Sequence, residues 1–112
     1  MQVRPLTEFD FHPRLADSNG VSLVLLSAPG CGSCRVWLRL LSDFTDPLLQ
    51  HCYVVDVQLA TAVAREYEVF HLPSLFLFVD GKFHAQLQAE ATPKQLSQAI
   101  GTLLNLPPQD EP

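Results

Sequence analysis

Three stretches of the chain are mainly apolar and lack the polar residue at every second position that marks a half-buried strand. They are Val21–Ser27, Cys52–Val57 and Ser74–Val79. A strand covered by helices on both faces carries apolar residues on both sides, so its sequence reads as a continuous run. The three stretches therefore predict interior strands of a sheet that has helices on both faces.

Two longer segments show the three-and-four spacing of a helix with one buried side. The first begins near Cys31 and ends before Asp46-Pro47, because a residue that precedes proline disfavours helical geometry. The second begins with Thr92, which has Pro93 at the first helical position and Gln95 three residues on, the pattern of a capping box. The expected buried positions are Cys34, Trp37, Leu38, Leu41 and Phe44 in the first segment, and Leu96, Ala99, Ile100, Leu103 and Leu104 in the second.

Shorter signals complete the expected order of elements. The alanine-rich segment Leu59–Val69 predicts a short helix, and Asp80-Gly81 is a strong signal for a two-residue hairpin. Apolar and polar residues alternate in the strand after this turn, so we expect one of its faces to be exposed to solvent. Its two sides are Phe83, Ala85 and Leu87 against His84, Gln86 and Gln88. At the amino end we expect a short strand around Gln2–Pro5, then a helix capped by Asp10.

Composition narrows the class of protein. The chain has 112 residues, enough for one domain with its own core. We expect that domain to be residues 1–106, followed by a mobile, acidic, proline-rich tail at 107–112. A net charge of −5 argues against a nucleic-acid partner. Without a signal-peptide layout or a membrane-length apolar run, we expect a cytoplasmic protein with no membrane partner. We also expect it to be a monomer.

Cys31 and Cys34 lie where a buried strand turns into a helix. Free N–H groups and the helix dipole at such a position favour a thiolate, and the cytoplasm keeps thiols reduced. We therefore favour a redox pair in which Cys31 attacks and Cys34, one turn inward, resolves. Zinc needs four ligands and no second close pair exists, so a metal would need two chains. Two cysteines that merely pack are the other alternative, and Cys52 is expected in the core.

The segment Ser27–Cys34 at a strand-to-helix junction and the segment Tyr67–Phe83, "YEVFHLPSLFLFVDGKF", together resemble thioredoxin-like proteins. The resemblance covers nearly the whole chain. It implies an α/β thioredoxin fold, with a central mixed sheet of four or five strands flanked by helices on both faces. It also implies a cis peptide bond before Pro73, facing the cysteines, and outward-pointing backbone groups on Leu72. The substrate-binding residues implied are Gly30, Gly32, Ser33, Leu72 and Pro73.

The chain departs from the family pattern at five positions. Gly30 stands where the family has tryptophan, and Ser33 stands where it has proline between the cysteines. Leu25 occupies the place of a buried aspartate that helps to move the proton of the second cysteine. Arg39 replaces a proline that kinks the helix, and Ala89 replaces a glycine of the docking surface.

The resemblance implies a thiol–disulfide oxidoreductase that serves cell redox homeostasis. Its partners would be protein disulfide substrates and an unidentified reductant, and it would need no cofactor and no metal. The departures favour one alternative, a thioredoxin-like binding or chaperone-type module with vestigial or redox-sensing cysteines. A dimeric metal or iron–sulfur site is a third possibility.

Overall fold

A five-stranded sheet runs through the centre of the computed structural model, which describes residues 1–112. The strands are β1 (Val3–Leu6), β2 (Val21–Ser27), β3 (His51–Asp56), β4 (Ser74–Val79) and β5 (Lys82–Leu87), in the order β1-β3-β2-β4-β5. The first three are parallel, whereas β4 and β5 are antiparallel to their neighbours. The predicted mixed sheet of the α/β thioredoxin fold is confirmed.

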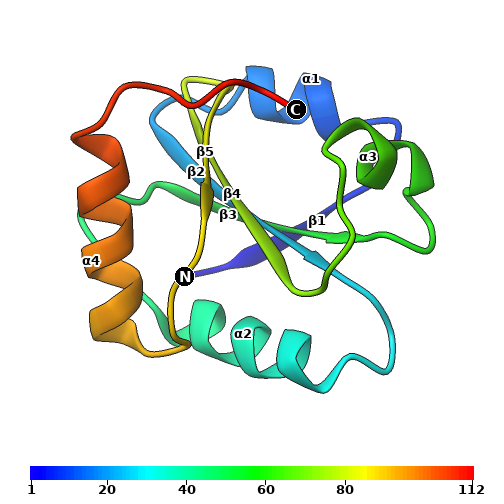
Figure 1. Ribbon diagram of the computed structural model, residues 1–112, viewed down its shortest axis with the longest axis horizontal. Coiled ribbons are helices and arrows are strands. Elements are labelled where there is room, and N and C mark those ends of the chain that lie inside the picture. Colours follow the sequence, from blue (N-terminus) through cyan, green and yellow to red (C-terminus); the bar gives the residue numbers. More distant parts are fainter.

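Four helices cover the sheet on both faces (Figure 1). They are α1 (Phe11–Ala16), α2 (Gly32–Asp43), α3 (Thr61–Glu66) and α4 (Pro93–Leu104). One core cluster joins the sheet to α2 and α4, and the other joins it to α1 and α3. None of the four helices is long and apolar enough to cross a bilayer.

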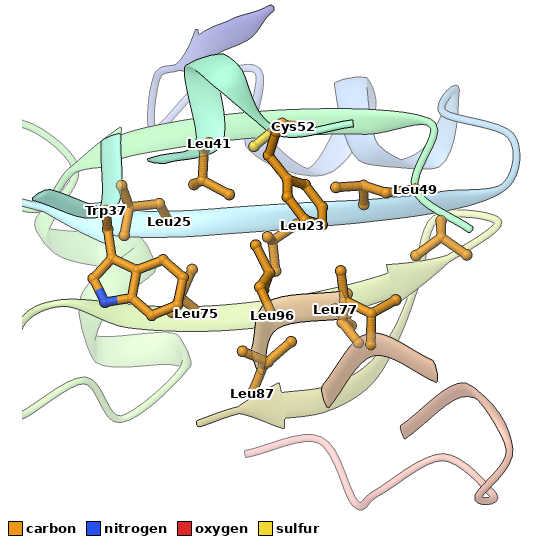
Figure 2. Packing of buried hydrophobic residues seen from close by; sticks show 13 residues of the cluster. Leu23, Leu25, Trp37, Leu41, Leu49, Cys52, Leu75, Leu77, Leu87 and Leu96 are labelled. Atoms are coloured by element: carbon orange, nitrogen blue, oxygen red, sulfur yellow. The ribbon is translucent and has the colours of Figure 1, made fainter. Parts of the chain in front are cut away.

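The continuous apolar run of β2 is explained by these two clusters. Leu23 and Leu25 belong to the cluster under α2 and α4, whereas Val24 and Leu26 belong to the cluster under α1 and α3. All four side chains are buried. Figure 2 shows Leu23 and Leu25 on the same side of the sheet as Trp37 of α2. The prediction that β2 is covered on both faces is confirmed.

The helices follow the predicted pattern with three corrections. In α2 the expected face is buried except at Leu38, which is 37% exposed at the edge of the helix. The helix predicted for Leu59–Val69 is shorter, because only Thr61–Glu66 is helical and Leu59 lies outside it. The start of α4 at Pro93 is as predicted, and Thr92 Oγ1 accepts the Gln95 N–H at 3.2 Å. The capping box is only half formed, because the Thr92 N–H donates to the backbone oxygen of Glu90 at 2.8 Å.

The strict alternation predicted for β5 is wrong because the strand contains a β-bulge. Phe78 pairs with Phe83, but its neighbour Leu77 pairs with Ala85, so His84 is the additional residue. His84 is therefore not on a solvent-exposed face of the strand. Its side chain is buried, and its Nε2 lies 2.7 Å from the backbone oxygen of Leu103 in α4. The bulge also separates Phe83 from Leu87, which now lie over different core clusters.

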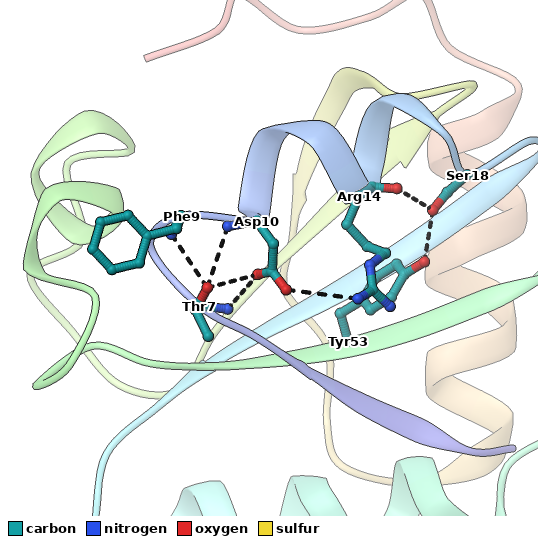
Figure 3. Close-up of polar contacts among 6 residues, drawn as sticks. All are labelled: Thr7, Phe9, Asp10, Arg14, Ser18 and Tyr53. Atoms are coloured by element: carbon teal, nitrogen blue, oxygen red, sulfur yellow. Dashed lines mark hydrogen bonds and ion pairs between the residues drawn. The ribbon is translucent and has the colours of Figure 1, made fainter.

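Asp10 is the N-cap residue of α1, as predicted, but its side chain accepts no N–H group of that helix, and Thr7 instead caps the turn that precedes it (Figure 3). Thr7 Oγ1 accepts the N–H groups of Phe9 and Asp10, both at 3.2 Å. Asp10 Oδ1 in return accepts the Thr7 N–H at 2.6 Å. These reciprocal bonds form a capping box. The hydrogen bond from the Thr7 backbone lowers the pKa of the Asp10 carboxyl, so Asp10 is charged at neutral pH.

The segment 107–112, expected to be mobile, lies along β5. The Gln109 N–H donates to the backbone oxygen of His84 at 2.7 Å, and Gln109 Oε1 accepts the Gln86 N–H at 3.0 Å. Figure 1 shows the segment crossing from the end of α4 toward α1. It occupies backbone groups at the open edge of the sheet, which edge strands otherwise leave unpaired. The domain boundary at residue 106 stays a prediction.

Candidate redox site

The two cysteines of the predicted redox pair form a disulfide at the start of α2. Their Cα atoms are 5.2 Å apart, within the usual range for a disulfide. Strand β2 ends at Ser27, and the chain then turns at Gly30, where φ is +81°. A residue with a side chain adopts this φ only with strain, so glycine suits the turn that presents Cys31.

Cys31 is the N-cap residue of α2, and its sulfur takes the place of a capping oxygen. The Cys34 N–H points at Cys31 Sγ from 3.2 Å. When the disulfide is reduced, the same N–H and the positive end of the helix dipole face the Cys31 sulfur. Both interactions stabilise a thiolate over a thiol, which is the form that attacks disulfides.

The two sulfurs differ in access. Cys31 is partly exposed, whereas Cys34 is 1% exposed beneath it. A partner can therefore reach Cys31 but not Cys34. The predicted substrate residues Gly30, Gly32 and Ser33 are all exposed around Cys31.

Pro73 lies at the same end of the sheet as the cysteines. The next residue, Ser74, pairs with Leu26 of β2, the strand that leads into the cysteine turn. The Leu72–Pro73 peptide bond is cis. Neither the N–H nor the C=O of Leu72 takes part in a backbone hydrogen bond within the chain. These two groups are free to pair with an extended chain, although the substrate contacts themselves stay a prediction.

No acid lies beneath the disulfide on the central strand. Leu25 is fully buried and pairs with Val54 on β3 and Leu75 on β4, so its cross-strand neighbours are apolar. No group of three or more His, Cys, Asp or Glu side chains is arranged to hold a metal ion. The two cysteines can exchange their disulfide with another sulfur compound.

Cys52 is the third thiol and lies apart from the pair, in the core cluster under α2 and α4. Burial raises the pKa of this thiol to about 12 from an ordinary value of 9.0. At pH 8 roughly one molecule in ten thousand would then carry a thiolate at Cys52. The residue is a buried apolar side chain, as the sequence predicted.

We expect Cys52 to resist alkylation in the folded protein. After reduction and treatment with iodoacetamide at pH 8, peptide mass spectrometry should show Cys31 modified within minutes and Cys52 unmodified. The same treatment in guanidinium chloride should modify all three cysteines, because unfolding removes the burial that raises the pKa of Cys52. Labelling of Cys52 in the folded protein at the rate seen in denaturant would contradict this assignment.

The sequence analysis identified both cysteines and the proline segment but missed the turn beside them. Thr7 and Asp10 have the spacing of a capping box, Thr-x-x-Asp, so a signal was present in the sequence. The exposure of the neighbouring Phe9 had no such signal, because an isolated phenylalanine reads as a core residue.

The family model for thioredoxin matches residues 2–102. Because this match covers most of the chain and agrees with the fold and the cysteine pair, the chain belongs to the thioredoxin family. Membership of the family and the disulfide together support thiol–disulfide oxidoreductase chemistry in general.

Three relatives illustrate the range of similarity. The chain is 30% identical over 100 residues to protein disulfide-isomerase like 2-2 of Arabidopsis thaliana, covering 86% of this chain and 22% of that protein. It is 28% identical over 98 residues to chloroplastic thioredoxin Y2 of Arabidopsis thaliana, covering 86% and 59%. It is 27% identical over 108 residues to chloroplastic thioredoxin Y of Oryza sativa subsp. japonica, covering 95% and 64%. The chain thus spans less than two thirds of the length of each of these relatives.

Two solved structures show the same fold. The oxidised mitochondrial thioredoxin 3 of Saccharomyces cerevisiae superposes with a TM-score of 0.72 at 23% identity, covering 89% of this chain and 94% of that chain. The zinc-bound form of human ERp44 superposes with a TM-score of 0.73 at 19% identity, covering 90% and 31%. At these identities the likeness extends to the fold alone.

Proposed function

We propose that the chain is a protein-disulfide oxidoreductase in which Cys31 and Cys34 exchange electrons with disulfides of polypeptide substrates. The observation that carries this proposal is the position of Cys31 Sγ, which accepts the Cys34 N–H at the N-cap of α2. The free N–H and C=O of Leu72 support a polypeptide substrate, because an extended chain could pair with them as with the edge of a sheet.

The reaction consists of two exchange steps. The Cys31 thiolate attacks one sulfur of the substrate disulfide, so that a mixed disulfide forms and the other substrate sulfur leaves as a thiolate. Cys34 then loses its proton and attacks Cys31, which closes the Cys31–Cys34 disulfide and releases the second substrate thiolate. The substrate gains two electrons, and its two thiolates take up the protons that the cysteines have lost.

Turnover needs a thiol reductant that reduces the Cys31–Cys34 disulfide again, and the chain itself holds none. The proposal therefore places the protein in a reducing compartment. The cytosol expected from the sequence is one such compartment, and the chloroplast named for two of the relatives is another. The oxidoreductase is proposed to act as a monomer without a cofactor.

The reduction of insulin by dithiothreitol tests the proposal, because the freed B chain precipitates and scatters light. The wild-type chain at micromolar concentration should shorten the lag before precipitation at least severalfold, and Cys31→Ser should remove this acceleration. The serine hydroxyl still accepts the Cys34 N–H, so the start of α2 is preserved. Equal and negligible acceleration by both proteins would refute the enzyme and favour the binding module.

A further inference from the structure

A cavity of about 520 Å³ opens beside the cysteine turn, at the end of the sheet where the parallel strands finish. Strands β1, β3 and β2 all contribute residues from their carboxyl ends, and the segment Ser27–Pro29 forms one wall. The chain leaves β2 toward α2 on one face but leaves β1 and β3 toward α1 and α3 on the other. Crevices at such divergence points are the common ligand sites of open α/β sheets.

The cavity is lined mostly by apolar side chains, and two of them are unusually exposed. Phe9 is 87% exposed and Leu59 is 79% exposed, although residues of these types are usually buried. They project from different turns, yet both line this one cavity. The hydrophobic residues of the lining are Leu6, Phe9, Ala28, Val54, Leu59 and Ala60, and Pro5 and Pro29 line it as well.

Hydrogen bonds fix the backbone of the two turns that carry these exposed side chains. The Phe9 N–H donates to Thr7 Oγ1 at 3.2 Å within the capping box, and Figure 3 shows the Phe9 ring directed away from α1. The Leu59 N–H donates to the backbone oxygen of Asp56 at 3.1 Å. Because the backbone of these turns is fixed before any ligand arrives, binding here avoids the entropy cost of ordering a loop.

The lining of the cavity ends two residues before the reactive cysteine. Pro29 lines it and precedes Cys31 by two residues. Two residues of extended chain span at most about 7 Å. A polypeptide whose disulfide is being attacked at Cys31 would therefore bring its next few residues to this cavity.

Charge at the cavity has one sign. The carboxyl-bearing residues Glu8 and Asp56 line it, and no basic residue does. Neither carboxylate forms an ion pair within the chain, whose two ion pairs involve other residues. An occupant with a positive charge beside an apolar side chain complements this lining.

We propose that the cavity is a specificity site for disulfide-bearing polypeptides that carry a large apolar residue next to a basic residue, close to the reacting cysteine. This inference rests on the proposed function, because it assigns a substrate class to the same Cys31 centre. The apolar side chain enters between Phe9 and Leu59, and the basic group lies near Glu8 and Asp56. The chemical step is the exchange at Cys31, unchanged.

Two synthetic peptides test the proposal, each closed by one intramolecular disulfide. Their cysteines are flanked by Leu-Lys in one peptide and by Ser-Ser in the other, dithiothreitol is the reductant, and mass spectrometry quantifies the reduced peptide. The wild type should show a kcat/KM about tenfold higher for the Leu-Lys peptide, the gain expected from burying one large apolar side chain. The double variant Phe9→Ala, Leu59→Ala should reduce this preference to less than twofold.

Matched variants separate the contribution of the apolar side chains to the peptide preference from that of the carboxylates. Leu48→Ala removes a 45% exposed leucine from the loop before β3, at the other end of that strand, and should leave the tenfold preference intact. The double variant Glu8→Gln, Asp56→Asn keeps the side-chain shapes but should lower the preference about threefold. Glutathione disulfide, which has neither a large apolar nor a basic side chain beside its disulfide, should be reduced at one rate by the wild type and all variants.

The outcomes also distinguish this inference from the function on which it rests. If the wild type reduces neither peptide nor glutathione disulfide faster than dithiothreitol alone, the oxidoreductase proposal fails. If it reduces both peptides equally well, only the specificity site is overturned. The specificity site would also be overturned if analytical ultracentrifugation showed a dimer that the Phe9→Ala substitution dissociates. The occupant of the cavity would then be a second copy of the chain.

Discussion

A Cys34→Ser variant is expected to accumulate a stable mixed disulfide between Cys31 and a substrate protein, at close to one complex per chain. Cys34 supplies the thiol that displaces the substrate, so its loss leaves the first exchange step without the second. The reduced variant would be incubated with an oxidised disulfide protein such as insulin, quenched with acid, and analysed by non-reducing electrophoresis and mass spectrometry. The wild type should show no lasting complex under the same conditions.

Cys31→Ser is the matched control, because it differs from Cys34→Ser only in which sulfur remains. Cys34 is 1% exposed, so a substrate disulfide cannot reach it and little complex should form. Cys52 is 2% exposed, and burial raises its pKa to about 12, so it should form none. Complexes of equal yield in the two variants would show that the sulfurs are equivalent, which would contradict the assignment of attacking and resolving roles.

The sequence predicted the elements whose patterns depend on many residues at once. The run Val21–Ser27 could be identified as an interior strand because seven positions together lack alternation, and the structure places β2 at these residues. Asp80-Gly81 predicted a hairpin because its two residues adopt positive φ readily, and they do so here at +50° and +81°. Such signals are local, so the fold could be inferred before any tertiary contact was known.

Features set by tertiary packing were not predicted. A bulge at His84 cannot be read from the alternation of β5, because it depends on pairing with β4 and on the contact with Leu103 of α4. The placement of residues 107–112 likewise depends on hydrogen bonds to β5, where composition alone suggested a mobile tail. In both cases a distant partner decides the conformation.

The candidate site likewise has one part that the sequence predicts and another that only the fold forms. Cys31 and Cys34 carry their own signal, since two cysteines at this spacing before a helix are informative without a structure. The cavity beside them is formed by turns from three strands, and its most exposed residues, Phe9 and Leu59, lie 50 positions apart in the chain. No short pattern relates them, so only the fold brings them together.

Leu25→Asp introduces the buried acid that the family pattern has at this position, and we expect it to destabilise the chain severely. Leu25 is fully buried, and Figure 2 shows it on the same side of the sheet as Trp37 and Leu75. Its cross-strand partners are Val54 on β3 and Leu75 on β4, so the side chains opposite it on both neighbouring strands are apolar. A carboxylate there would lose its hydration and gain nothing in exchange.

The size and the pH dependence of the effect follow from linkage. Burial of this kind raises a carboxyl pKa by roughly 3 to 5 units. At a pH above this raised pKa, the shift lowers the free energy of unfolding by about 4 to 7 kcal/mol. The whole free energy of unfolding of a domain of this size is about 5 to 15 kcal/mol. Because the folded pKa is raised, the unfolded state loses its proton first, so the stability of the variant falls as the pH rises from about 4.

Leu25→Asn is the control, since it has the same shape as Leu25→Asp and does not titrate. Urea unfolding followed by Trp37 fluorescence at pH 4 and pH 7 should give nearly equal midpoints for the two variants at pH 4. At pH 7 the aspartate variant should be far less stable or already unfolded, while Leu25→Asn should change no more than the wild type. An aspartate variant as stable as the asparagine variant at pH 7 would show that the site can hold a charge. The apolar neighbours of Leu25 would then not be what prevents this chain from holding the acid that the family pattern implies.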